Sequence, residues 1–164
     1  MKFKILENKT FYIKKFKDGL TVGDIFFRFP WLLGAILYDA VLGKTGWDEL
    51  IWYNGVWVRG TWEYGFWENG TWKYGTWKYG LWKNGTWKNG LWENGRWENG
   101  TWKDGTWKYG EWRKGIWKNG IWKNGTWKDG TWEDGTWEEG YIWDKENKEW
   151  IYSTKPPKKR KKKI

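Results

Sequence analysis

Thr86-Trp87-Lys88-Asn89-Gly90 is one copy of a five-residue unit, x-Trp-x-x-Gly, and this unit decides the fold of the chain. Eighteen complete copies follow one another from Ile51 to Gly140. Gly46 to Leu50 form an imperfect copy, which keeps the Trp and lacks the final Gly. The array of residues 47–140 fills more than half of the 164-residue chain, and such regularity specifies a shape more strongly than a reaction.

The residue types in the unit predict short strands joined by tight turns. The fourth position is Asn in eight copies and Asp in three, and Asn-Gly and Asp-Gly favour a type I′ hairpin turn. The first position is Thr in nine copies, and β-branched residues favour extended backbone. We therefore expect an all-β repeat array: a narrow, twisted antiparallel meander of three-residue strands, with every Trp on one side of the sheet.

In this meander the tryptophans of the complete copies form a structural ladder of neighbouring indoles. Each offset or edge-to-face pair adds about 0.5–1.5 kcal/mol, and sheet twist can turn the Trp side inward. The ladder consists of Trp52, Trp57, Trp62, Trp67, Trp72, Trp77, Trp82, Trp87, Trp92, Trp97, Trp102, Trp107, Trp112, Trp117, Trp122, Trp127, Trp132 and Trp137.

A four-sided β-solenoid, in which each copy forms one side and four copies make a coil, is the alternative. In its favour, seven copies place Arg, Tyr, Lys or Glu where a type I′ turn prefers Asn or Asp. Against it, four indoles would crowd an interior about 10 Å across in a coil about 4.8 Å tall. The charges at the third position, compared ten, fifteen or twenty residues apart, give similar mixtures and do not decide.

Residues 1–46 predict a small mixed cap that closes the first edge of the array. Met1 to Phe16 alternates in patches and predicts a β-hairpin. Thr21 and Asp24 have the spacing of a capping box at a helix start, and the apolar stretch Trp31 to Leu42 predicts a further helix.

Residues 141–154 predict a capping hairpin over the last edge, where unpaired backbone would invite aggregation. Residues 155–164 hold seven positive charges and no negative one, so we expect a disordered basic tail. Within this tail, Pro157 to Lys163 resembles the short basic type of nuclear localisation signal. Its candidate contacts to a polyanion are Lys155, Lys158, Lys159, Arg160, Lys161, Lys162 and Lys163.

The composition argues against an enzyme. The chain has no Cys and no His, which removes the thiolate nucleophile, the usual general base and the commonest metal ligand. Ser153 is the only serine and has no histidine to activate it. Gly43-Lys44-Thr45 lacks the earlier Gly that a P-loop requires, and Asp129, Asp134 and Glu139 fit no Ca²⁺-loop spacing. We expect no catalytic residue, cofactor or metal.

A membrane span is also disfavoured. Within Ile25 to Leu42 the uninterrupted apolar part, Trp31 to Tyr38, is far shorter than the roughly 20 residues that cross a bilayer. The segment does not resemble a signal peptide. The expected location is a virion or the host cytoplasm, or the nucleus in a eukaryotic host.

The tandem copies, such as Thr86 to Gly90, resemble the Trp-Gly pentapeptide repeats of phage-encoded proteins, and this resemblance implies a virion or other phage structural component. Gly85 to Gly90 also resembles the G-x-W-x-x-G centre of MORN repeats. That resemblance implies antiparallel hairpin arrays that act as scaffolds and, in some members, lipid-binding platforms. MORN units are much longer and carry Gly and Tyr positions that are missing here.

We therefore expect a non-enzymatic structural or scaffold repeat protein, a rigid spacer in an assembly. Its partners would be other structural proteins, and the tail would contact nucleic acid or an acidic partner; oligomers are compatible with this role. The alternative is a binding module whose Trp face takes carbohydrate, lipid headgroups or single-stranded nucleic acid. From Ile51 to Gly140 there are 13 basic and 11 acidic residues, a balance that disfavours polyanion binding along the repeats.

Overall fold

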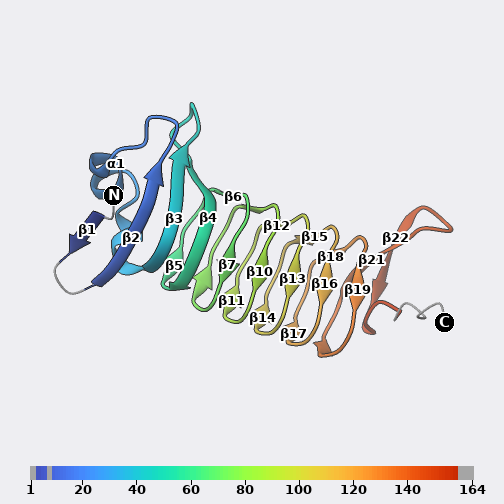
Figure 1. The fold of residues 1–164 in the computed structure, drawn as a ribbon. Helices are drawn as coiled ribbons and strands as arrows, with labels where there is room; N and C mark the ends of the chain where they lie inside the picture. The colour runs from blue at the N-terminus through green and yellow to red at the C-terminus, as the bar shows by residue number, and fades with distance from the viewer. Residues whose placement is uncertain (1–2, 7–8, 159–164) are drawn as a thin grey trace, which may run out of the picture.

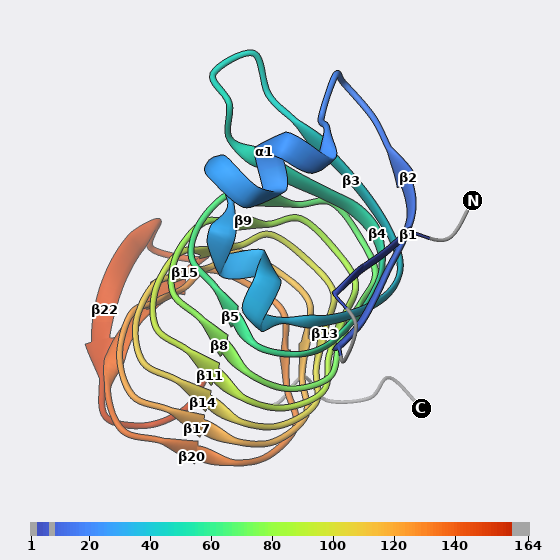
Figure 2. The same cartoon turned by 90° about the vertical axis from the view of Figure 1, so that its left-hand side faces the viewer.

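The repeats form a three-sided β-solenoid in the computed structural model, which describes residues 3–6 and 9–158 (Figures 1 and 2). Each unit makes one side of a coil. Each strand pairs in parallel with the strand fifteen residues later, as Trp72 pairs with Trp87. Eighteen units at three to a coil make six coils. The all-β array is confirmed, and of the two expected architectures the solenoid is the correct one.

The two β-sheets of the solenoid provide its three sides. Side 1 contains the first half of β4 (Leu50–Arg59), β6 (Phe66–Trp67), β9 (Leu81–Trp82), β12 (Arg96–Trp97), β15 (Glu111–Trp112), β18 (Thr126–Trp127) and β21 (Gly140–Asp144). Side 2 contains the second half of β4, β7 (Thr71–Trp72), β10 (Thr86–Trp87), β13 (Thr101–Trp102), β16 (Ile116–Trp117) and β19 (Thr131–Trp132). Side 3 contains β5 (Thr61–Trp62), β8 (Thr76–Trp77), β11 (Leu91–Trp92), β14 (Thr106–Trp107), β17 (Ile121–Trp122) and β20 (Thr136–Trp137).

The expected antiparallel meander is wrong, because the Asn-Gly and Asp-Gly pairs form corners and not hairpin turns. A type I′ turn needs positive φ at both central residues. Only the Gly has it here, with φ between +110° and +151° from Gly55 to Gly140, whereas every fourth-position residue has negative φ. Tyr, Arg, Lys and Glu therefore fit the fourth position without strain. The antiparallel hairpins implied by the MORN resemblance are likewise not formed by the repeats.

Asn and Asp are nevertheless favoured at the corner for a local reason. The side-chain oxygen of Asn89 accepts a hydrogen bond from the N–H of Gly90 at 2.6 Å. Asp104 and Asn124 make the same contact with their following glycines at 2.8 and 2.6 Å. Such a bond gives a corner N–H a partner that the β-ladder does not supply.

The glycines are required because consecutive coils approach closely at each corner. The ladder joins the coils through bonds such as Lys88 N to Trp72 O at 2.8 Å and Thr86 N to Gly70 O at 2.9 Å. A Cβ atom on Gly90 would lie well inside contact distance of the Gly75 carbonyl oxygen. Positive φ and this close approach both exclude larger residues.

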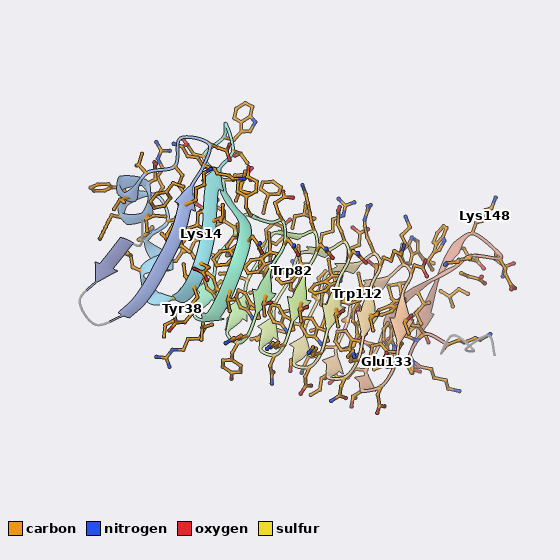
Figure 3. The ribbon with its side chains drawn as sticks, viewed as in Figure 1. Lys14, Tyr38, Trp82, Trp112, Glu133 and Lys148 are labelled. Atoms are coloured by element: carbon orange, nitrogen blue, oxygen red, sulfur yellow. The ribbon has the colours of Figure 1, made fainter. Side chains whose placement is uncertain are left out.

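The tryptophans fill the interior as three columns, one for each side, in place of the single expected ladder. Within a column, the ring centroids of successive indoles lie 4.6–5.0 Å apart and the planes differ by 4–7°. Indoles of neighbouring columns meet edge to face, with centroids 5.6–6.4 Å apart and planes at 68–80°. Figure 3 shows Trp82 and Trp112 of one column inside the ribbon.

Three sides replace the expected four because three indoles complete each layer of the interior. An indole in the middle of the array, such as Trp87, contacts the indoles before and after it in its own column and one indole in each of the other two columns. For Trp87 these are Trp72 and Trp102 above and below, and Trp82 and Trp92 beside it. A fourth indole in each layer would have to enlarge this ring, and voids or overpacking would cost stability.

The N-terminal region closes the first coil. β1 (Phe3–Leu6) and β2 (Lys9–Phe16) pair antiparallel, as expected, and β2 pairs in parallel with β3 (Ile36–Lys44). Between β2 and β3 lie the helix α1 (Val22–Phe27) and the 3-10 helix η1 (Pro30–Gly34), which Figure 2 shows at the open end of the coils. The expected capping box of Thr21 and Asp24 is confirmed.

Each indole column ends on one residue of this cap. Leu42 of β3 pairs with Trp52, and Leu37 pairs with Trp57. The ring of Trp31 in η1 packs edge-on against Trp62 with a centroid distance of 5.1 Å. The first indole of each column is therefore fully buried, namely Trp52, Trp57 and Trp62.

The helix expected over Trp31 to Leu42 is wrong, because most of this stretch forms β3. Its apolar pattern does not alternate simply, since the pairing with β4 shifts between Tyr38 and Val41 around Asp39, whose φ is +50°. Such a bulge inserts residues into the strand and resets the alternation. Pairing with the edge of β4 therefore outweighs the local sequence pattern that predicts a helix.

The other end is closed on one side only. β21 continues side 1 and pairs antiparallel with β22 (Glu149–Ser153), which confirms the expected hairpin. Among the described residues no strand follows β19 on side 2 or β20 on side 3. The imperfect copy also lies outside the array: its Trp47 is 90% exposed in the β3–β4 loop.

Trp87→Ala should lower the free energy of unfolding by about 3–5 kcal/mol, because it opens a cavity between four indoles. Trp137→Ala should lower the free energy of unfolding clearly less, since Trp137 is 7% exposed and stacks on one other indole of its column. Urea denaturation of both variants measures the difference. Equal losses would show that the columns do not act as a packed core.

Gly90→Ala should cost at least about 1–3 kcal/mol from backbone strain alone, with the clash against Gly75 in addition. Gly34→Ala is the matched control, because a Cβ there meets nothing within 4 Å. Thermal denaturation should lower the melting temperature of the first variant and leave that of the second nearly unchanged.

Candidate binding surfaces

The Trp face cannot serve as a binding surface, because it forms the core. All ladder tryptophans from Trp52 to Trp137 are buried. Among the few indole N–H groups with acceptors, Trp112 and Trp122 donate to corner carbonyls of the next coil at 3.1 Å. Trp87 and most others make no hydrogen bond, so ring packing holds them. A ligand that stacks on these indoles would have to unfold the coils.

A groove runs along the corner between sides 3 and 1. Its volume is about 610 Å³, and exposed tyrosines at the fourth position form one wall while first-position residues of side 1 form the other. The glycines between these walls form its floor. The lining includes Tyr64, Tyr79, Asn94, Tyr109, Phe66, Leu81, Arg96 and Glu111.

The groove was missed in the sequence, although a signal for it exists. Tyr64 and Tyr79 are fifteen residues apart, and Tyr109 follows after two further intervals of fifteen, with Asn94 between them. A three-sided coil brings such residues onto one corner. The same tyrosines are scattered over different corners if the coil has any other number of sides.

The fifteen-residue period also sorts the charges by side. On side 3 the third-position residues are three glutamates and three lysines, and Lys78 lies 2.9 Å from Glu63 in the preceding coil. Lys108 pairs with Glu93 at 3.6 Å and Lys123 with Glu138 at 4.0 Å.

Side 1 has similar contacts between coils. Lys83 lies 2.8 Å from Glu68, and Arg96 lies 3.4 Å from Glu111. These exposed pairs contribute little individually, but they balance the charge of both sides.

Side 2 differs, because its third-position residues are lysines in four successive coils. Lys73, Lys88, Lys103 and Lys118 are all exposed. None of the ion pairs in the described part of the chain includes any of them. We call these four residues the lysine stripe. The near-neutral net charge of the whole array does not reveal the lysine stripe, because the compensating acidic residues lie mostly on sides 1 and 3.

The expected polyanion contacts of the tail are only partly described. Lys155 and Lys158 are exposed, and Lys155 N–H donates to the Ser153 hydroxyl at 3.0 Å. Lys159 to Lys163 lie outside the described residues. The expected disorder of the whole tail therefore remains a prediction.

The three acidic residues that were considered for a cation site do not come together. Asp129, Asp134 and Glu139 lie on three different corners, since they follow three successive sides. Residues 3–6 and 9–158 contain no group of three His, Cys, Asp or Glu that could hold a metal ion. Within the same residues no helix reaches the length and hydrophobicity needed to cross a bilayer.

Lys44 of the P-loop-like tripeptide joins a polar cluster in the N-terminal cap. Its ammonium lies 3.0 Å from Asp48 and 3.5 Å from Asp24, and Arg28 also contacts both carboxylates. Hydrogen bonds from Thr21 hold the pKa of Asp24 below its usual value, and the bond from Lys44 does so for Asp48. The cluster ties α1 to the β3–β4 loop.

Searches of protein-family models, curated proteins and solved structures returned no match to this chain.

Tyr53 provides a pH-dependent test of the cap. Its hydroxyl donates to Asp18 Oδ2 at 2.6 Å, and mainly because of this bond the pKa of Tyr53 rises to about 12. The neutral phenol is thus favoured by folding. Its contribution to stability should be complete below about pH 10, the ordinary Tyr pKa, and should disappear as the pH rises to about 12.

Tyr53→Phe should therefore reduce the free energy of unfolding at pH 8, and the deficit relative to the native chain should shrink above pH 10. Urea denaturation across this range measures it. Tyr79→Phe, which alters an exposed phenol of the groove, controls for general alkaline effects. A deficit independent of pH would contradict the role of the bond to Asp18.

Proposed function

We propose that this chain is a non-enzymatic structural repeat protein that acts as a stiff spacer within a larger assembly. The observation that carries the proposal is the uninterrupted packing of three indole columns over all six coils. Because each coil contacts only its neighbours through the same bonds and rings, the solenoid is a rod of fixed direction.

The two ends of the rod differ in ways that suit attachment. The N-terminal cap carries large apolar side chains on its surface, Phe27 at 89% and Trp47 at 90% exposure. The C-terminal end carries the hairpin β21–β22, with Lys148 at its outer tip (Figure 3), and then the basic tail. In the proposal the apolar cap docks on another structural protein, and the tail contacts nucleic acid or an acidic partner.

Assembly in a virion follows as part of the proposal from the resemblance to phage pentapeptide repeats. The same proposal accounts for the chain's use of one unit eighteen times. A rod requires repetition of a packing layer, whereas a catalytic centre requires residues that break the repetition.

Deleting residues 121–135 removes one coil, and it should shorten the rod by about 4.8 Å without rotating its ends. Deleting residues 126–130 removes one side and should rotate the C-terminal hairpin by about a third of a turn. Both variants keep x-Trp-x-x-Gly in register and leave the lysine stripe intact. Small-angle X-ray scattering and thermal denaturation should confirm two folded rods.

Expressed in the source organism, the five-residue deletion should impair the assembly more than the fifteen-residue deletion, because it misorients the ends. The measurement is the amount of the protein that sediments with large particles, and the yield of those particles. If the native protein is found free in solution and both variants behave as it does, the proposal that the chain is a spacer is wrong.

A further inference from the structure

We propose that the lysine stripe on side 2 binds the phosphate backbone of an extended single-stranded nucleic acid, independently of the C-terminal tail. The stripe comprises Lys73, Lys88, Lys103 and Lys118, which lie in consecutive coils on one flat side of the rod. This goes beyond the spacer role and does not depend on it.

The position of the four lysines in the sheet makes the stripe regular. Each follows a buried Trp, and its own N–H bonds to the Trp carbonyl of the preceding coil, as Lys103 N does to Trp87 O at 2.8 Å. The backbone therefore sets the spacing of the side chains. The indoles beneath them lie 4.8 Å apart from Trp72 to Trp117, so the stripe extends for about three such intervals.

The lysine stripe differs from the lysines of side 3 because its positive charges are not paired with carboxylates of the described residues. Lysines at the same position on side 3 each meet a glutamate of a neighbouring coil, as Lys78 meets Glu63 at 2.9 Å. Each lysine of the stripe has another lysine as its neighbour across the ladder. Like charges directly opposite one another destabilise a sheet. A bound row of anions would remove this repulsion.

The surroundings of the stripe extend its positive field. Arg59 begins the same side, and Lys114 lies on the corner that precedes it. Asp104 is the one acid on this side before the last coil, and its carboxylate accepts from Gly105 N–H at 2.8 Å. Glu133 of the last coil ends the stripe, so the stripe is not continuous with the basic tail.

The chemistry of lysine points to phosphate and not to bases. An ammonium group is a compact point charge without the fixed fork of a guanidinium, so it binds phosphate without reading sequence. The exposed ring of Tyr74, beside Lys73, offers a single surface on which a base could stack. We therefore expect binding that is sensitive to salt and insensitive to sequence.

The straight shape of the stripe favours a single strand over a duplex. In B-form DNA each strand advances about 3.4 Å along the axis per phosphate and winds around it. A straight row meets such a backbone only where a strand crosses it. A flexible single strand can lie along all four lysines.

The test compares two quadruple variants of the full chain. The first carries Lys73→Gln, Lys88→Gln, Lys103→Gln and Lys118→Gln. The matched control carries Lys78→Gln, Lys83→Gln, Lys108→Gln and Lys123→Gln, which removes four lysines that pair with glutamates on sides 1 and 3. Each set lowers the formal net charge from +10 to +6.

Fluorescence anisotropy with a labelled 20-nucleotide oligothymidine, recorded over a range of salt concentrations, measures binding. Loss of four phosphate contacts should make the slope of log K against log salt less steep by about 3, and should weaken binding by roughly a hundredfold at 0.1 M salt. The control set should retain the native slope. Equal weakening by both sets, or none by the first, would overturn the proposal.

Two further arms locate the contact and identify the ligand. The same two sets in a chain that ends at Thr154 should differ as they do in the full chain, because the tail is a separate contact. A duplex of the same length and a sulfated polysaccharide should compete less well than the single strand. If either competes better, the ligand class is wrong. Thermal denaturation should show the stripe variant at least as stable as the native chain.

Discussion

Offset stacking of indoles at the spacing of a β-ladder is the interaction on which the whole structure depends. Hydrogen-bonded strands lie about 4.7–4.9 Å apart, and carbon atoms attract best at about 3.5–4.0 Å. Parallel rings on neighbouring strands can meet both conditions only if they slide past each other. The columns do so, with centroids 4.6–5.0 Å apart. The backbone and the core therefore repeat with one period and neither strains the other.

The other features follow from that shared period. A corner must bring consecutive coils close enough for the ladder to continue, and Gly75 and Gly90 meet this demand. Because three units close a coil, every residue gains neighbours fifteen positions away. Tyr64 and Tyr79 consequently share one groove, and Lys88 and Lys103 share one stripe, although nothing in the adjacent sequence connects them. The interior is the same in every coil, whereas the residues on the outer surfaces of the three sides differ from coil to coil.

Much of this could be predicted from local sequence, and the rest depends on closure of the coil. The β-rich array, the capping box of Thr21 and the final hairpin each have local signals. The number of sides has none, because x-Trp-x-x-Gly describes one side and is silent on how many complete a layer. Without that number, the groove and the stripe could not be found. β3 was missed for another reason, since the bulge at Asp39 conceals its alternation.

The columns also determine how this protein interacts with light. The eighteen indoles form three columns of six, and within each column the rings are nearly parallel and closer together than their own ring systems are long. Their electronic transitions couple at such distances, so an absorbed photon is shared along a column before it is emitted. Ultraviolet circular dichroism will contain strong bands from this coupling in addition to those of the backbone. Secondary-structure content derived from such a spectrum would misrepresent a protein that is almost entirely β.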